Sequence, residues 1–128
     1  MDPVQVEGDP LTAEAIGAAI EVHRYLGPGL LESVYHKCLI HELELRGVTV
    51  RTQVSVPITY KGLVVENALL LDILVGDELI LELKSVERME PIFEAQLLTY
   101  MRLSGIRKGL LLNYNSRLMK DGIKRMVL

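Results

Sequence analysis

The sequence has few of the residues that form cross-links or membrane segments. Its 128 residues include one cysteine, Cys38, and no tryptophan. An internal disulfide, a four-thiolate zinc site and an iron–sulfur cluster built by this chain alone are therefore excluded. The best candidate for a membrane span, residues 68–75, is interrupted by Asp72 and is much shorter than the ~18 apolar residues required. Because the start of the chain carries acidic but no basic residues, it does not fit a secretory signal, and we expect a cytoplasmic protein without a membrane segment.

Basic residues are scarce in most of the chain and concentrated near its C-terminal end. Residues 1–101 carry 7 Lys or Arg against 16 Asp or Glu, a net charge of −9, whereas residues 102–128 carry 7 against 1, a net charge of +6. The overall charge of −3 argues against strong non-specific binding to nucleic acid, which depends on neutralising phosphates. The basic segment itself fits either a local phosphate-facing patch or an ordinary solvated surface.

The composition is that of a globular domain. Hydrophobic residues make up 49% of the chain and charged residues 24%, a balance that excludes wholesale disorder. A chain of this length suits one hydrophobic core, because two separate cores would each be marginal. We expect a flexible leader at residues 1–8 and a single domain over residues 9–128.

Hydrophobic periodicity predicts helices and strands in the order α-α-β-β-β-α-β. The helices cover residues 10–25, 30–46 and 90–104, and the strands cover residues 48–60, 63–75, 79–86 and 109–114. Residues 118–128 fit either a helix or a final strand. Because segments 68–75 and 79–84 are apolar on both faces, we expect them inside a sheet with helices on both sides. The pattern indicates an α/β fold with a mixed α+β sheet.

Three charged residues interrupt the apolar strands. Asp72 lies in the middle of one strand, and Glu82 and Lys84 lie two residues apart in the next, hence on one face. Burying an unpaired carboxylate costs several kcal/mol, so such groups are paired, hydrogen-bonded or bound to metal. One interpretation is a structural ion pair within the sheet. The other is a site where two carboxylates bind Mg²⁺ or Mn²⁺ beside a lysine.

The hairpin turn tests the second interpretation. A two-residue turn at Gly76-Asp77 would place Asp72 opposite Leu81 and leave Glu82 on the other face of the sheet. A shared cation therefore requires a three-residue turn that includes Glu78, or a β-bulge, and we predict that irregularity.

Two further polar pairs have helical spacing. Glu32 and Tyr35 are three residues apart near the start of the second helix, and Gln96 and Tyr100 are four apart in the third. Each pair therefore lies on one helix face. Taken alone, Glu32 also fits a carboxylate stabilised by the helix dipole, and Gln96 with Tyr100 fits a half-buried polar stripe.

Together these residues resemble the GxxExxY protein family, a branch of the PD-(D/E)XK nuclease superfamily. The motif that names the family is present as Gly29-Leu-Leu-Glu32-Ser-Val-Tyr35. The superfamily core is matched by Asp72 and Glu82-Leu83-Lys84, and Gln96-Leu-Leu-Thr-Tyr100 is similar to the QxxxY motif of RecB-like nucleases. With segments 109–115 and 120–125, the likeness spans residues 11–127. The motifs are weak separately, but five in the right order are specific.

The resemblance implies a restriction-endonuclease-like core, which is a mixed sheet flanked by helices. It also implies that Mg²⁺ or Mn²⁺ is held by Glu32, Asp72 and Glu82, with the Leu83 carbonyl as a fourth ligand. The expected reaction is hydrolysis of a phosphodiester bond in DNA or RNA by a metal-activated water.

The resemblance also assigns roles around the metal. Lys84 would serve the nucleophilic water, and Gln96 and Tyr100 would position Lys84, the metal site or a substrate phosphate. Relatives often carry arginine two residues before the aspartate, where this chain has Leu70. Any phosphate or carboxylate contact made by that arginine is therefore in doubt here.

Two hypotheses of function follow. The first is a divalent-metal-dependent nuclease. The alternative is a non-catalytic, nuclease-like module for binding or assembly, which the small size, the acidic charge and Leu70 favour. Because so short a chain has little surface for an extended substrate, a homodimer that contributes two basic C-terminal faces fits the first hypothesis.

Overall fold

The computed structural model describes residues 9–128, which pack around one five-stranded sheet. The leader expected at residues 1–8 lies outside the described residues. The elements, in chain order, are α2 (Pro10–Leu26), α3 (Glu32–Leu45), β1 (Val50–Tyr60), β2 (Leu63–Val75), β3 (Leu79–Lys84), α4 (Pro91–Ser104), β4 (Lys108–Asn113), the 3-10 helix η1 (Met119–Gly122) and β5 (Ile123–Val127).

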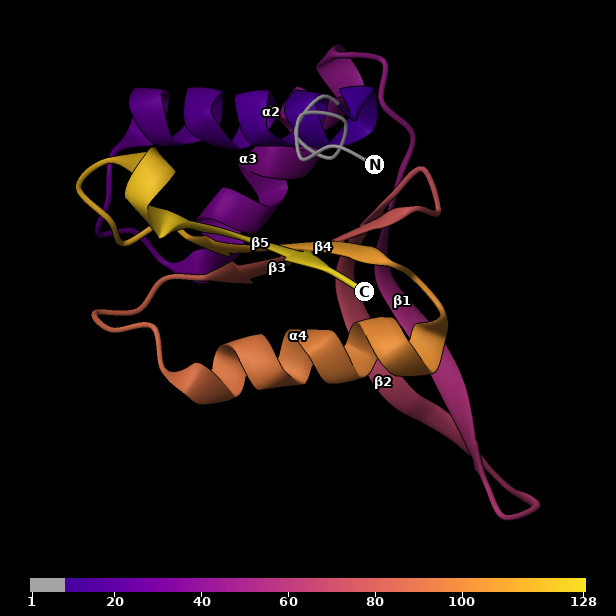
Figure 1. The fold of residues 1–128 in the computed structure, drawn as a ribbon. Coiled ribbons are helices and arrows are strands. Elements are labelled where there is room, and N and C mark those ends of the chain that lie inside the picture. The colour runs from indigo at the N-terminus through magenta and orange to yellow at the C-terminus, as the bar shows by residue number, and fades with distance from the viewer. Residues whose placement is uncertain (1–8) are drawn as a thin grey trace.

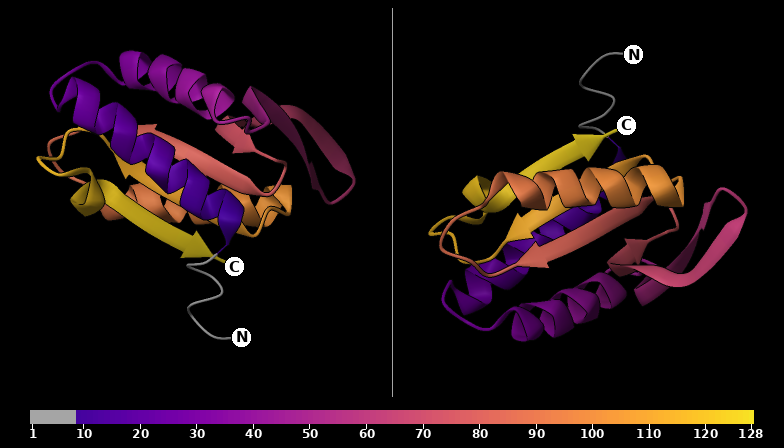
Figure 2. Two further views of the ribbon diagram at one scale, coloured as in Figure 1. Left: turned by 90° about the horizontal axis from the view of Figure 1, so that it is seen from above. Right: turned by 90° about the horizontal axis from the view of Figure 1, so that it is seen from below.

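The sheet is mixed, and its strands follow the order β1-β2-β3-β4-β5. The β3–β4 pair is parallel, and the other three pairs are antiparallel. The parallel connection passes through α4, which covers one face of the sheet while α2 and α3 cover the other (Figure 1). Views from above and below show the same two helical layers (Figure 2). The predicted mixed sheet with helices on both faces is therefore confirmed, and the undecided C-terminal segment forms η1 and β5.

Two hydrophobic clusters fill the spaces on either side of the sheet. The cluster under α2 and α3 contains Leu39, Leu81 and Tyr114, and the cluster under α4 contains Ile80 and Leu97. Strands β3 and β4 contribute to both clusters because their side chains alternate between faces. This double burial explains the apolar character of both strands.

A glycine in β4 lets α4 pack closely on the sheet. A Cβ atom at Gly109 would lie 2.9 Å from Sδ of Met101 and 3.2 Å from a Cδ of Leu97, both on α4. Since cores are packed near the density of organic crystals, a larger residue here would push the helix outward. Among residues 9–128, no helix is both long and apolar enough to cross a membrane.

Candidate active site

The hairpin between β2 and β3 aligns the two buried acids. Val75 pairs with Leu79 and Ile73 with Leu81, so three residues, 76–78, form the turn and the next position places Asp72 opposite Glu82. The Glu78 amide donates a hydrogen bond to the Val75 carbonyl at 3.0 Å, which closes the turn. The predicted three-residue turn is confirmed, and both acids occupy one face of the sheet.

Where β2 and β3 separate, the side chains of the two acids accept hydrogen bonds from backbone amides, in place of main-chain hydrogen bonds between the strands. The Asp72 amide donates to Oε1 of Glu82 at 3.3 Å, and the Leu83 amide donates to Oδ2 of Asp72 at 3.0 Å. The backbone pairing of β2 with β3 ends just before them, at Ile73 and Leu81. Within residues 9–128, the second oxygen of each carboxylate has no hydrogen-bond partner. Each acid therefore keeps one oxygen available for a ligand.

Burial and charge repulsion perturb Glu82. Its exposed fraction is only 7%, and no Lys, Arg or His lies within ion-pair distance of it in the described part of the chain. Burial, followed by the adjacent Asp72 carboxylate, raises the pKa of Glu82 to about 7. The Lys84 ammonium opposes this shift without forming an ion pair with Glu82, so a buried carboxyl group with a raised pKa is the feature that this site must explain.

Glu32 approaches the pair from the first turn of α3. Desolvation and then the Asp72 carboxylate raise the pKa of Glu32, and the Lys84 ammonium acts in the opposite direction. The His36 side chain, one turn further along α3, lies 3.4 Å from the Asp72 carbonyl through Nε2. The start of α3 thus lies beside the point where β2 and β3 part.

The tyrosine of the GxxExxY motif fixes the loop that leads to Glu32. The hydroxyl of Tyr35 donates to the Gly27 carbonyl at 2.6 Å and accepts from the Leu30 amide at 3.0 Å. Its ring is fully buried and stacks on Tyr114, with centroids 4.4 Å apart. Gly29 has φ 96°, in the left-handed region that favours glycine. The spacing of the motif therefore has a structural cause, since glycine allows the turn and tyrosine holds it.

The expectation that all three acids meet at one point is only partly fulfilled. Among residues 9–128, no group of three or more His, Cys, Asp or Glu side chains is arranged to hold one ion. Asp72 and Glu82 are together, whereas Glu32 lies within electrostatic range but remains exposed. Glu32 is coupled to the pair through its charge, because the Asp72 carboxylate raises the pKa of Glu32.

Lys84 follows Glu82 on the same face of β3. Its Nζ atom lies 4.5 Å from the centre of the Phe93 ring in the first turn of α4, a cation–π contact. No ion pair within 4.0 Å joins it to a carboxylate in the described part of the chain. The ammonium is therefore held near the acids without being neutralised by them.

The predicted pair on α4 also forms. Nε2 of Gln96 donates to the Tyr100 hydroxyl at 3.3 Å, with the Gln96 side chain exposed and Tyr100 half-buried. Within residues 9–128, neither side chain hydrogen-bonds to Lys84, Asp72 or Glu82. The pair is thus available on the face of α4, but its assigned role at the site stays a prediction.

The structure adds a residue at the end of β4 that sequence reasoning did not single out. The buried side chain of Asn113 accepts from the Val86 amide at 3.1 Å and donates to the Val86 carbonyl at 3.0 Å. It thereby ends β3 at Lys84, two residues before the predicted end, and fixes the segment that leaves the site. Its position at the end of an apolar strand could have identified it from the sequence. Ligand sites in open sheets lie beyond the carboxyl ends of strands, so a polar residue there is a candidate site residue.

The donor set fits a divalent cation. Asp72 and Glu82 each offer a free carboxylate oxygen, the hard ligand that Mg²⁺ and Mn²⁺ prefer. A bound cation would also favour the ionised form of the buried Glu82, in the same direction as the Lys84 ammonium.

Comparisons with known proteins agree with this geometry. A search of curated proteins and a search of solved structures each give no match to the chain. The family model of the PD-(D/E)XK nuclease superfamily matches residues 9–126, which is nearly the whole chain. The match includes both paired acids, Lys84 and the α4 pair, and the observed sheet agrees with the restriction-endonuclease-like fold that was expected. The chain therefore belongs to the PD-(D/E)XK nuclease superfamily.

Proposed function

We propose that this protein is a divalent-metal-dependent nuclease that hydrolyses phosphodiester bonds in DNA or RNA. The observation that carries the proposal is the buried Glu82 carboxylate, which faces Asp72 and has no cationic partner among residues 9–128. Asp72, Glu82, Glu32 and the Leu83 carbonyl would hold Mg²⁺ or Mn²⁺. When bound, the ion polarises the scissile phosphate and lowers the pKa of a water molecule.

The protein groups would orient the reacting atoms. The Lys84 ammonium, which lies over Phe93, would hydrogen-bond to the attacking water and offset charge on a phosphoryl oxygen. Gln96 and Tyr100 would position Lys84 or a substrate phosphate from α4. Glu32 would complete the ligand set by a rotation of its exposed side chain, since its helix already begins beside Asp72.

The finer assignments extend this proposal. We assign the chain to the GxxExxY branch, with the QxxxY variant of the α4 motif, and we take residues 9–128 as one cytoplasmic domain. A homodimer would contribute two basic C-terminal faces to one nucleic acid. Each assignment rests on the motifs and charge distribution described above.

Cleavage assays test the nuclease proposal. DNA and RNA are incubated with the wild-type protein and with Lys84→Ala, in Mg²⁺ and in Mn²⁺. Lys37→Ala, which removes the same charge from an exposed site on α3, is the matched control. We expect cleavage by the wild type and by Lys37→Ala, and a loss of at least a hundredfold in Lys84→Ala, as for removal of a group that stabilises developing charge. Equal background in all three proteins would refute the proposal.

A non-catalytic module is the second candidate, and the exposed position of Glu32 favours it. Leu70, which replaces the arginine of many relatives, is 52% exposed on β2 and offers no charge to a phosphate. Calorimetric titration with Mn²⁺ separates the two candidates. Binding that disappears in Asp72→Asn supports the nuclease, whereas a module without metal shows no binding that depends on Asp72 or Glu82.

A further inference from the structure

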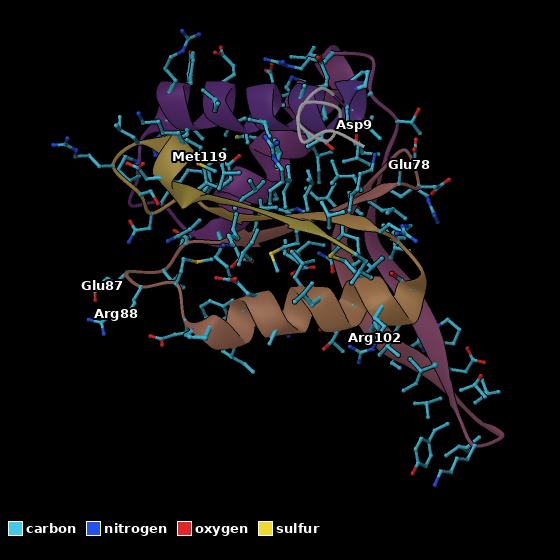
Figure 3. The ribbon with its side chains drawn as sticks, viewed as in Figure 1. Asp9, Glu78, Glu87, Arg88, Arg102 and Met119 are labelled. Carbon is cyan, nitrogen blue, oxygen red and sulfur yellow. The ribbon has the colours of Figure 1, made fainter. Side chains whose placement is uncertain are left out.

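A cavity lies at the same end of the sheet as the candidate active site. It has a volume of about 620 Å³, within the usual range of small-ligand pockets, and is bounded by the end of α2 and by η1. Met119, which lines it, and Glu87 and Arg88, which follow β3, all lie at this end of the molecule (Figure 3). Since β3 ends at Lys84, the cavity and the active site lie at one edge of the fold.

Hydrogen bonds tie the cavity wall to the site. Gly27 lines the cavity, and its carbonyl accepts the hydroxyl of Tyr35, the residue one helical turn after Glu32. On the other side, the Tyr114 amide donates to the Lys84 carbonyl at 2.9 Å, where the chain leaves β4 toward η1. A ligand in the cavity would therefore be held in a fixed relation to both Glu32 and Lys84.

The cavity has the opposite charge to the carboxylate site. Its charged lining residues are all cationic, namely Arg24, Arg117 and Lys120, and none of its lining residues is Asp or Glu. Arg24 forms an ion pair with Glu21, whereas Arg117 and Lys120 are exposed and form none within the described residues. The carboxylates of the active site repel the phosphates of a substrate strand that are not bound to the metal ion, so cations beside the site favour binding of the strand.

The rest of the cavity wall is apolar. Pro28, Leu118 and Met119 contribute to it, and Leu118 is 47% exposed. A site for phosphate alone has no need of such a surface. A sugar or base has apolar surface that such a wall can cover, as the apolar lining of small-ligand pockets does.

We propose that this cavity binds one nucleotide of the substrate strand, adjacent to the phosphodiester that is cleaved. Arg117 and Lys120 would hold its phosphate, and the sugar or base would lie against the exposed side chains of Pro28 and Leu118. The proposal rests on the proposed nuclease function. It means that part of the basic C-terminal segment is a phosphate-facing patch rather than an ordinary solvated surface.

The test measures binding rather than cleavage. A fluorescently labelled single-stranded oligonucleotide is titrated with the full chain in EDTA, and its anisotropy is followed at several salt concentrations. Arg117→Ala/Lys120→Ala is compared with Arg102→Ala/Arg125→Ala, which removes two exposed charges from α4 and β5, outside the cavity lining. We expect the cavity variant to bind at least tenfold more weakly and the control to bind like the wild type. The slope of log K against log salt should fall by about 0.7, the value for one lost phosphate contact on a single strand.

Competition identifies the ligand. A nucleoside monophosphate should displace the oligonucleotide from the wild type at concentrations where inorganic phosphate does not. Equal weakening in the two double variants, or equally effective displacement by inorganic phosphate, would overturn the proposal. Binding to phosphatidylserine vesicles is measured for the same proteins. If Arg117→Ala/Lys120→Ala loses vesicle binding but binds the oligonucleotide like the wild type, the cavity binds lipid phosphate and the proposal is wrong. The binding measurements test the cavity alone and the cleavage assays test the nuclease proposal. The two can fail independently, because the cavity variant can lose nucleotide binding whether or not the wild type cleaves.

Discussion

Replacing Glu82 with glutamine should stabilise the metal-free protein, although it removes a charged residue from the centre of the site. The wild-type carboxylate is 7% exposed and lies beside Asp72, and these two conditions raise its pKa from 4.5 to about 7. Glutamine resembles the protonated form of the side chain and keeps an oxygen that can accept the hydrogen bond from the Asp72 amide. The substitution therefore removes the penalty of ionisation and preserves the local contact.

The raised pKa gives the sign and the size of the effect. The folded state binds the Glu82 proton more tightly than the unfolded chain, so wild-type stability falls as pH rises from 4.5 through about 7. At about 1.4 kcal/mol per pKa unit, the shift corresponds to on the order of 3 kcal/mol above this range. We expect Glu82→Gln to match the wild type at pH 4.5 and to exceed it by up to this amount at pH 8.

Urea denaturation in EDTA at the two pH values measures the difference in unfolding free energy. Glu87→Gln is the matched control, because it makes the same chemical change on an exposed loop beyond β3. An advantage of Glu82→Gln that does not depend on pH, or a variant less stable than the wild type at pH 8, would refute the reasoning. Added Mn²⁺ should reverse the order by stabilising the wild type alone.

Three further predictions follow from the same structure. Since Glu82 must lose its proton to bind a cation, Mn²⁺ affinity should fall about tenfold per pH unit below about 7, as calorimetry would show, and a flat profile would contradict this role. Tyr35→Phe leaves the Gly27 carbonyl and the Leu30 amide without their partner and should cost about 1–3 kcal/mol in urea denaturation; a neutral effect would show that water replaces the hydroxyl. Gly109→Ala should cost about 1–3 kcal/mol by pushing α4 from the sheet, and an unchanged melting temperature would mean that the helix shifts freely.

The sequence by itself determined the elements and the pairing of the two buried acids. Periodicities of two and of about 3.6 residues are local properties, so β2 has the predicted bounds and the helices end close to theirs. The alignment of Asp72 with Glu82 also followed from local reasoning, because side chains alternate along strands and the number of residues in the turn decides which faces coincide. The form of the C-terminal segment could not be derived in this way, since the β5 pattern depends on pairing with β4.

Only the tertiary structure decided the electrostatic state of the site and what surrounds it. The pKa of Glu82 depends on burial and on a carboxylate from another strand, and the pKa of Glu32, on α3, is raised in part by the charge of Asp72 on β2. The hydrogen bonds between Asn113 and Val86 join segments that are distant along the chain, and so does the cavity between the end of α2 and η1. These properties depend on distances and solvent exposure that only packing fixes, because Coulomb energy and desolvation depend on separation in space and on the surrounding dielectric.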